Sequence, residues 1–300
     1  MSTVTAIIVN YNTGEYAVAC VRSLLTQHYR ALSIIVVDNA STDGSVALLR
    51  STFGNKIELI ESPSNLGFGR ANNLAALKVK TDYLLLVNPD AQLLTPDFTS
   101  ELIAFMVQHP AVGIAGPIIQ EPLKRRKIVP PKRHYPFQDR LRDKTFLQHL
   151  PGQYAWLLGA CLCIRSDLYQ KIAGFDPDYF LYGEDTDICL RARKAGFEIG
   201  YCEEAKLTHV GGASEVAAIP LDKFLRKQRG RYLFCLKHYS SSDVKRIAYL
   251  SLASTYYAAC RNKMQRLLRL KSQPLLENDK QKIKATRLVI REVLDRLHLQ

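Results

Sequence analysis

Residues 32–45, LSIIVVDNASTDGS, place a polar loop directly between a short apolar run and the start of a helical pattern. The run Leu32–Val37 is nearly continuous in apolar side chains, which is typical of a strand that is buried on both faces of a parallel sheet. The helical pattern begins at Ser45. This strand–loop–helix unit is the building block of an α/β sheet, and the first 120 residues repeat it.

Apolar runs and helical patterns alternate through this part of the chain. We expect strands at residues 5–9, 32–37, 57–60, 83–87 and 112–115, and helices at 15–27, 45–53, 70–79 and 97–108. Thr95 as N-cap, Pro96 at the first position and Asp97 in the first turn predict where the last of these helices starts. The pattern predicts a doubly wound, mainly parallel α/β sheet, whose ligands bind at the carboxyl ends of the strands.

The sequence changes character after this sheet. Glu121–Leu150 is rich in Pro, Lys and Arg and has no apolar periodicity, which predicts a mobile loop. Residues 154–164, YAWLLGACLCI, predict another strand. From Asp222 to Gln300 there are 19 Lys and Arg against 6 Asp and Glu, whereas the first 221 residues hold 22 of each kind. We therefore expect a domain at 1–221 and a basic, amphipathic helical extension at 222–300.

The extension shows helical periodicity. Asp243–Leu270 predicts one apolar stripe, and Ile283–Leu297 repeats the pattern. The stripe consists of Val244, Ile247, Ala248, Leu252, Tyr256, Ala259, Met264, Leu267 and Leu268. Basic patches of this kind attract nucleic acid, acidic lipid headgroups or phosphorylated substrates, and a solvated face without a partner is the remaining alternative.

Location and redox state follow from what the sequence lacks. It contains no run of 18 apolar residues, so we expect no helix that spans a bilayer. The N-terminus, MSTVTAIIVNYN, lacks the basic and apolar regions of a secretion signal. We therefore expect a cytoplasmic protein in which the seven cysteines are mostly reduced.

Polar residues follow three of the predicted strands, in VNYNTGEY (9–16), VVDNASTDGS (36–45) and LLLVNPDAQ (84–92). They can simply be turn and cap formers. If these strand ends bind a nucleotide, Asp38 could accept hydrogen bonds from a base or ribose, and Tyr11 could stack on the base. Arg70 could reach the nucleotide, and Asp90 could bind a divalent cation that bridges two phosphates.

His209, in THVGG, is a second metal or phosphate candidate, although a lone His beside two glycines is more often structural. Three carboxylates stand together in YGEDTDICLRARKAG (182–196). They suit the first turn of a helix, and one of them could also be a catalytic base. Asp185 and Asp187 lie about 200° apart around a helix, so both cannot face one site.

Taken together and in this order, VNYN, VVDNASTDGS, NLGFGRANN, NPDA, GFDPDYFLYGEDTDICLRARKAGF and THVGG resemble the family 2 inverting glycosyltransferases of the GT-A fold. The resemblance is greatest to the rhamnosyltransferase-like branch and covers roughly residues 3–240. It implies a GT-A type fold and an enzyme that uses a nucleotide sugar.

The resemblance also implies roles for individual residues. Asp38 and Arg70 would contact the nucleotide, while Asp90 and His209 would hold Mg²⁺ or Mn²⁺ or contact the diphosphate. Asp185 would be the general base, with Glu184 orienting the turn or the acceptor. Two further expectations concern the neighbouring subsites: Trp156 would line the acceptor site, and Asn88, at the nucleotide, stands where the metal motif of the family often has Asp.

The expected reaction moves a sugar, with rhamnose as the first candidate, from a dTDP or UDP donor to a cell-envelope glycan or lipid-linked acceptor. We expect the chain to lie on the anionic cytoplasmic face of the inner membrane without binding nucleic acid, and its oligomeric state stays open. A nicotinamide-dependent oxidoreductase is one alternative, but GFGRAN (67–72) lacks the third glycine of the dinucleotide fingerprint. The other alternative is a non-enzymatic basic module that binds nucleic acid, but the sequence contains no recognisable nucleic-acid-binding motif.

Overall fold

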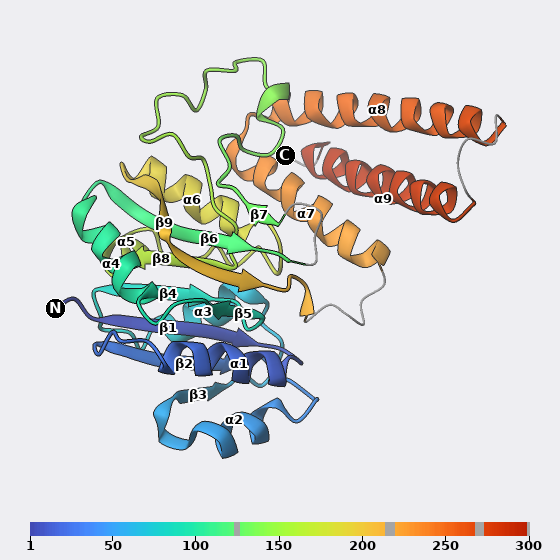
Figure 1. Cartoon of the computed structure of the whole chain (residues 1–300). Helices are drawn as coiled ribbons and strands as arrows, with labels where there is room; N and C mark the ends of the chain where they lie inside the picture. Colours follow the sequence, from blue (N-terminus) through green and yellow to red (C-terminus); the bar gives the residue numbers. More distant parts are fainter. Residues whose placement is uncertain (123–126, 214–219, 268–272, 299–300) are drawn as a thin grey trace. The chain divides into compact units, whose positions relative to one another are not determined.

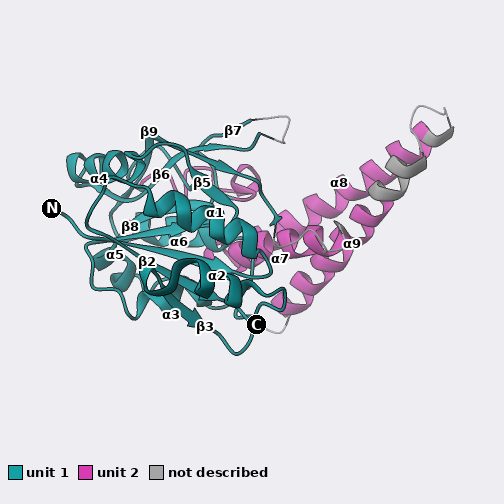
Figure 2. Cartoon of the chain, turned by 60° about the horizontal axis from the view of Figure 1, so that its bottom comes forward, with its two compact units in different colours: residues 1–135, 150–216 teal, residues 136–149, 217–300 magenta. Residues whose placement is uncertain are grey.

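The computed structural model describes residues 1–122, 127–213, 220–267 and 273–298, which form two compact units (Figure 1, Figure 2). Unit 1 comprises residues 1–135 and 150–216, and unit 2 comprises residues 136–149 and 217–300. The domain boundary that we expect at residue 222 stays a prediction. Over the described ranges, no helix combines the length and the apolar character that a membrane span requires.

Unit 1 is built on one sheet with the strand order β3-β2-β1-β4-β8-β6-β9-β5, and β7 pairs with β6. The strands are β1 Val4–Asn10, β2 Leu32–Asp38, β3 Glu58–Glu61, β4 Tyr83–Val87, β5 Ala91–Leu93, β6 Val112–Gln120, β7 Ile128–Val129, β8 Cys161–Arg165 and β9 Glu198–His209. All five strands expected within the first 120 residues are confirmed.

The first four strands in the sheet, β3, β2, β1 and β4, are parallel (Figure 1). Beyond β4 the sheet is mixed, because β8 runs antiparallel to both β4 and β6, while β6 and β9 are parallel. The parallel register sets Asn10 beside Asp38, so the polar residues that end β1 and β2 share one edge of the sheet. The predicted α/β class is confirmed.

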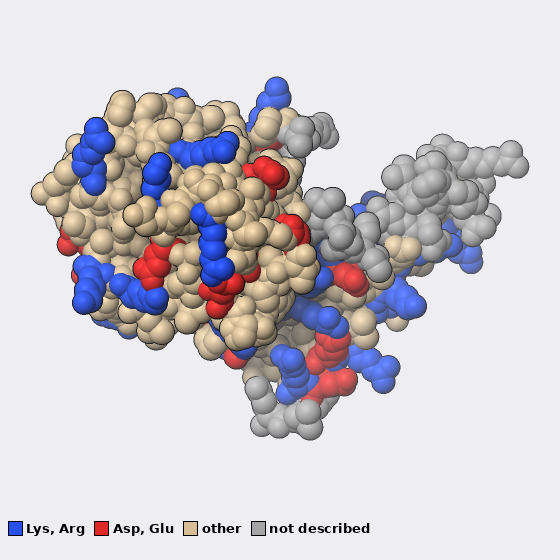
Figure 3. Space-filling model, turned by 90° about the horizontal axis from the view of Figure 1, so that it is seen from below, with Lys and Arg blue, Asp and Glu red and all other residues tan. Residues whose placement is uncertain are grey.

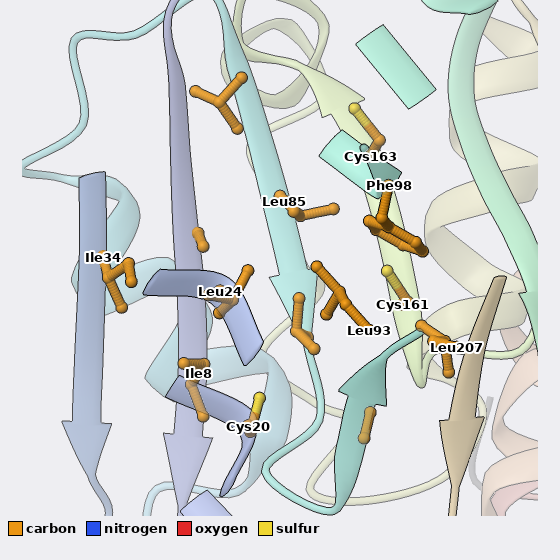
Figure 4. Close-up of a cluster of buried hydrophobic side chains, with 14 of the residues drawn as sticks. Ile8, Cys20, Leu24, Ile34, Leu85, Leu93, Phe98, Cys161, Cys163 and Leu207 are labelled. Carbon is orange, nitrogen blue, oxygen red and sulfur yellow. The ribbon is translucent and has the colours of Figure 1, made fainter. Parts of the chain in front are cut away.

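Helices cover both faces of the sheet. They are α1 Gly14–Leu25, α2 Ser45–Phe53, α3 Phe68–Ala76, α4 Phe98–Gln108, α5 Ser166–Lys171 and α6 Glu184–Lys194. Alternate residues of β1 point to opposite faces: Ile8 belongs to the core shared with α1, α2 and α4 (Figure 4), and Ile7 to the core shared with α3, α5 and α6. This is the double winding that the sequence predicts.

All seven cysteines are free thiols, and six are buried. Cys161 and Cys163 lie two residues apart on β8, so both point into the core of Figure 4. Burial raises the pKa of Cys163 to about 12, which keeps this thiol neutral and makes it a packing group.

The start of α4 corrects one expectation, because the helix begins at Phe98 with Asp97 as its N-cap. Residues 95–97 are instead held by the chain around the end of α1. The Gln27 side chain donates to the Thr95 carbonyl, and the His28 backbone donates to the Pro96 carbonyl. The Asp97 side chain contacts His28 Nδ1 at 3.0 Å. These tertiary contacts outweigh the local start signal.

The segment between β6 and β8 also differs from the expectation. The strand predicted at 154–164 is confined to Cys161–Arg165, and Trp156 instead forms a bridge pair with Lys132. Of the predicted mobile loop at 121–150, residues 123–126 lie outside the described residues. The remainder contains β7 and a 3-10 turn at Gln138–Arg140, together with buried side chains: Tyr135, Leu141, Leu147 and Leu150.

The described residues of unit 2 include the α-helices α7 Pro220–His238, α8 Ser241–Leu267 and α9 Gln273–His298. Its interior includes Tyr232, Phe234, Val244, Ile247, Ala248, Val289, Ile290 and Val293. The apolar stripe predicted for α8 is correct at its start but wrong further along, because Tyr256 and Met264 are exposed. Ser251, Thr255 and Asn262 are buried in their place, and Leu268 lies outside the described residues.

A backbone junction joins the start of α3 to the loop before α6. The Phe68 N–H donates to the Phe180 carbonyl at 3.0 Å, and Asn73 bonds both the N–H and the carbonyl of Phe175. Gly67 makes this approach possible, because its φ is +80° and a Cβ there would lie 2.3 Å from the Phe180 oxygen. The residue pattern NLGFG therefore positions the acidic start of α6.

We predict that Gly67→Ala destabilises the protein by several kcal/mol, because it adds a backbone clash to the cost of positive φ, which is of order 1 kcal/mol. Gly44→Ala is the matched control, since Gly44 has φ +83° and open space around the added Cβ. Chemical denaturation of both variants measures the difference. Equal losses of stability would contradict the proposed junction.

Candidate active site

The carboxyl ends of β1 and β2 are joined by buried side chains. Asn10 donates to Asp38 Oδ1 at 2.8 Å and to Ser41 Oγ at 3.1 Å, and it accepts from the Thr13 hydroxyl at 2.8 Å. The Ser41 N–H donates to Asp38 Oδ2 at 2.9 Å. Asp38 is only 2% exposed, so its carboxylate organises the two loops. Its contact with a nucleotide stays a prediction.

The network continues toward α3. Asn39 donates to the Asn65 side chain at 2.9 Å, and its own oxygen accepts from the Leu66 N–H at 2.8 Å. Arg70 follows on α3, where it is exposed and donates through Nε to the Pro177 carbonyl at 2.7 Å. Arg70 is thereby held against the loop that leads into α6.

A second cluster lies at the end of β4. One oxygen of Asp90, Oδ2, accepts from the N–H groups of Gly211, Gly212 and Ala213 at 3.0, 3.2 and 3.3 Å. The other oxygen, Oδ1, faces Nε2 of His209 at 3.3 Å. Burial raises the pKa of Asp90, but His209 and these backbone donors outweigh it, so the pKa lies below its ordinary value. Asp90 is therefore a carboxylate at neutral pH.

Glu121 completes this cluster, although no local sequence pattern points to it. Its Oε1 lies 3.1 Å from Nδ1 of His209, and both residues are almost fully buried. The imidazole therefore lies between two carboxylates, with Nδ1 toward Glu121 and Nε2 toward Asp90. The Asn88 amide also contacts Nε2 at 3.3 Å. The order Glu121–His209–Asp90 is that of a carboxylate which orients an imidazole toward a ligand.

The cluster provides two side chains suited to a divalent cation, an Asp90 oxygen and the His209 Nε2. In the described part of the chain, no group of three or more His, Cys, Asp or Glu side chains could hold a metal ion by itself. The remaining positions around a cation would have to come from a ligand or water, as is common for Mg²⁺ beside phosphates. The residues present fit such a shared site.

The acidic start of α6 separates into three environments. Asp187 is fully buried and forms an ion pair with Arg191 at 2.7 Å, which is a structural contact. Glu184 is 7% exposed, and its Oε2 is buried without a hydrogen-bond partner. Burial, and next the charge of Asp185, raise the pKa of Glu184 to about 8. Glu184 is therefore largely protonated at neutral pH.

Asp185 is half-buried and held by backbone donors. Oδ2 accepts from the Gly159 N–H at 3.1 Å, and Oδ1 accepts from the Thr186 N–H at 2.7 Å. Burial is the largest influence on this group, and its pKa lies above the ordinary value. A raised pKa makes the carboxylate a stronger base, while the neutral Glu184 beside it avoids a second negative charge.

A short chain of contacts connects Asp185 to the metal candidates. Gly159 donates to Asp185, and the next residue, Ala160, accepts from the Asn88 N–H at 2.9 Å. The Asn88 side chain then contacts His209. A Cβ on residue 159 would lie 3.2 Å from the Asp185 Cβ, so glycine allows this close approach. The structure thus brings Asn88, Asp90, His209 and Asp185 into one connected region.

Tyr11 and Trp156 lie on loops, the first after β1 and the second before β8. Tyr11 follows β1 directly and is half-buried between Asn10 and Asn12. The Trp156 ring is also half-buried, and its Nε1–H donates to the His134 carbonyl at 3.0 Å. Their roles in base stacking and in acceptor binding stay predictions.

The raised pKa of Glu184 predicts a pH dependence of stability. Between the ordinary pKa of 4.5 and about 8, the folded protein keeps a proton that the unfolded chain has lost. The free energy of unfolding therefore falls as pH rises through this window. We predict that Glu184→Gln removes this slope, so that the variant melts several degrees above the wild type at pH 8 and close to it at pH 4.5.

The measurement is the melting temperature across this pH range, where 1 kcal/mol corresponds to about 2–4 °C in a domain of 150–250 residues. Glu203→Gln is the control, because Glu203 is exposed on β9. Parallel profiles for wild type and Glu184→Gln would show that Glu184 is ionised in the folded protein.

Comparisons with known proteins identify the family of this chain. The family model described as glycosyl transferase family 2 matches residues 5–172. An N-acetylglucosaminyl-diphospho-decaprenol L-rhamnosyltransferase of Mycobacterium tuberculosis is 26% identical over 263 residues, which cover 78% of this chain and 84% of that protein. An O-antigen chain rhamnosyltransferase of Salmonella typhimurium is 23% identical over 212 residues, which cover 69% of this chain and 66% of that protein.

Among solved structures, a mannosyltransferase from Pyrobaculum calidifontis in complex with GDP-Man and Mn²⁺ superposes with a TM-score of 0.62. It is 16% identical, and the alignment covers 96% of this chain and 86% of that one, which supports the fold. Because the family model matches more than half of the sequence, this chain belongs to glycosyl transferase family 2 and is a nucleotide-sugar-dependent glycosyltransferase.

Proposed function

We propose that the enzyme transfers a sugar, with inversion, from a nucleoside diphosphate to a hydroxyl of a glycan or lipid-linked acceptor. Rhamnose from dTDP-β-L-rhamnose is the first candidate, and it would give an α-rhamnoside. The relatives named as rhamnosyltransferases support this donor. The observation that carries the proposal is the short chain of contacts described above. It connects Asp185, a base of raised pKa, to His209 and Asp90. Membership of this family decides against the oxidoreductase and the nucleic-acid module.

Asp185 acts as the general base. It takes the proton from the acceptor hydroxyl as that oxygen forms a bond to the anomeric carbon. The bond from this carbon to the donor phosphate breaks on the opposite face, and the electron pair leaves with the nucleoside diphosphate. Gly159 and Thr186 hold both oxygens of Asp185 in place, which fixes the base before the acceptor arrives.

The donor lies along the strand ends in this proposal. The base and ribose are held near Asp38 and Tyr11, and Arg70 contacts the nucleotide. Asn88 lies between the donor and His209. Asp90 and His209 would hold Mg²⁺ or Mn²⁺, which would neutralise the diphosphate as it departs. The Mn²⁺ in the related mannosyltransferase complex supports a divalent metal here.

The acceptor subsite includes Trp156, whose loop continues into Gly159 and so to Asp185. Glu184, neutral beside the base, can donate a hydrogen bond to the acceptor through Oε2, the carboxyl oxygen that has no partner within the protein. A relative that acts on a decaprenol-linked sugar supports a lipid-linked acceptor. The enzyme would then work at the cytoplasmic face of the inner membrane.

We predict that Asp185→Asn lowers turnover about 10²–10⁴-fold, because the amide keeps the size of the side chain and one of its two accepted hydrogen bonds but cannot take the proton. Donor affinity should not change, which thermal shifts with dTDP and UDP sugars in the presence of Mn²⁺ would measure. Glu203→Gln should match the wild type in both assays. Retained turnover in Asp185→Asn would place the base elsewhere, and no response to any nucleotide sugar would refute the donor site.

A second prediction concerns Glu121, which orients His209 through Nδ1. We expect Glu121→Ala to weaken Mn²⁺ binding in the presence of a nucleoside diphosphate by about 10–100-fold. Glu121→Gln should lose less, because the amide oxygen can still accept the Nδ1–H. Calorimetry measures both variants, with circular dichroism as the check on folding. Wild-type Mn²⁺ affinity in well-folded Glu121→Ala would show that His209 does not bind the metal.

A further inference from the structure

Helix α8 carries apolar side chains on two faces. Val244, Ile247 and Ala248 are buried within unit 2, and this side continues through Ser251 and Thr255. The opposite side is exposed over a long stretch. Its large apolar residues are Tyr249, Leu250, Tyr256, Tyr257 and Met264, which are 58%, 41%, 54%, 71% and 61% exposed.

These exposed residues form one continuous face. With Ala253 and Cys260, which are also exposed, they recur every three or four residues, which is the spacing of one side of a helix. We refer to Tyr249, Ala253, Tyr256, Tyr257, Cys260 and Met264 as the tyrosine face. It extends about 22 Å along the helix, at 1.5 Å per residue.

Basic side chains border the tyrosine face. Arg246, Arg261 and Lys263 are exposed on α8, and Arg287 of α9 lies over the Tyr256 ring at 4.3 Å. Leu288, which is 46% exposed, follows Arg287 on α9. The sequence of α8 contains no acidic residue after Asp243. Lys and Arg side chains reach the surface of this helical unit in the view of Figure 3.

We propose that the tyrosine face is the surface through which the enzyme lies on an anionic lipid membrane. Tyr side chains have an apolar ring and a polar hydroxyl, and they favour the boundary between headgroups and acyl chains. Met264 and Leu288 add aliphatic area that can enter this boundary. The bordering Lys and Arg residues attract acidic headgroups, and no nearby carboxylate on α8 opposes them.

Two other kinds of partner fit the tyrosine face less well than a membrane does. A second copy of the chain would bring two strongly basic units together, and like charges in contact oppose association. Single-stranded nucleic acid would use the rings and the cations, but Met264 and Leu288 offer no ring on which a base can stack. This proposal rests on the proposed function, because it names the surface that would hold the enzyme at the membrane. It does not depend on the residues of the sugar-transfer site.

Vesicle flotation of the full-length protein tests this proposal, with no donor or acceptor present. We expect binding to vesicles of phosphatidylglycerol and phosphatidylcholine, little binding to phosphatidylcholine alone, and release by salt. The double variant Tyr256→Ser/Tyr257→Ser should bind at least about tenfold more weakly. Arg261→Gln/Lys263→Gln should lose a similar factor and become less sensitive to salt.

Matched controls lie on unit 1. Leu77→Ser removes an apolar side chain that is 84% exposed, and Lys80→Gln removes an exposed cation, and both should bind vesicles as the wild type does. Cys260 gives an independent reading, because the other six cysteines are buried and a polarity-sensitive thiol dye would mark the tyrosine face alone. Its emission should shift to the blue on anionic vesicles.

Three results would overturn the proposal. The first is unchanged vesicle binding in both double variants. The second is a wild-type dimer in sedimentation that Tyr256→Ser/Tyr257→Ser dissociates without affecting vesicle binding. The third is loss of oligonucleotide binding in that variant while vesicle binding persists. Turnover on a detergent-soluble acceptor should be the same in these variants as in the wild type, so failed lipid binding and failed sugar transfer are separate outcomes.

Discussion

A chain of buried charged and polar groups, Glu121–His209–Asp90, holds the ends of three strands together. Asp90 follows β4, His209 ends β9 and Glu121 follows β6, with contacts of 3.1 and 3.3 Å between them. Buried groups of this kind are costly unless they are paired, so none of the three strand ends can move away without leaving an uncompensated partner. Asn88 contacts His209 directly, and Asp185 is connected to Asn88 through the backbone of Gly159 and Ala160. The geometry of the whole site therefore depends on the chain Glu121–His209–Asp90.

The start of α6 shows how one stretch can serve the fold and the chemistry together. Three neighbouring carboxylates would repel one another if all were charged and exposed to the same environment. Their surroundings separate them: Asp187 is neutralised by Arg191, and Glu184 is kept largely protonated by burial. Asp185 alone combines partial exposure, a raised pKa and two fixed hydrogen bonds. The helix that they begin is the scaffold for the base.

Local pattern was sufficient where neighbours in sequence decide the structure. The helix expected at 45–53 has these bounds, and the apolar run at 32–37 is β2 apart from its last residue, Asp38. Pattern failed where distant residues decide. Thr95 looks like an N-cap but is bound by Gln27, 68 residues away, and Glu121 meets His209 across 88 residues. Tyr256 fits an apolar stripe by spacing, yet it is exposed, because apolar periodicity cannot distinguish a face that packs from one that meets another surface.

The central claim is that the polar ends of β1, β2 and β4, with β9, form one donor site. A crystal structure of the enzyme with Mn²⁺ and dTDP or UDP tests it most directly. The account predicts the base beside Asp38 and Tyr11, the diphosphate between Arg70 and Asn88, and anomalous density for Mn²⁺ within about 2.3 Å of Asp90 and His209. A nucleotide bound away from these strand ends, or Mn²⁺ held by other residues, would contradict it.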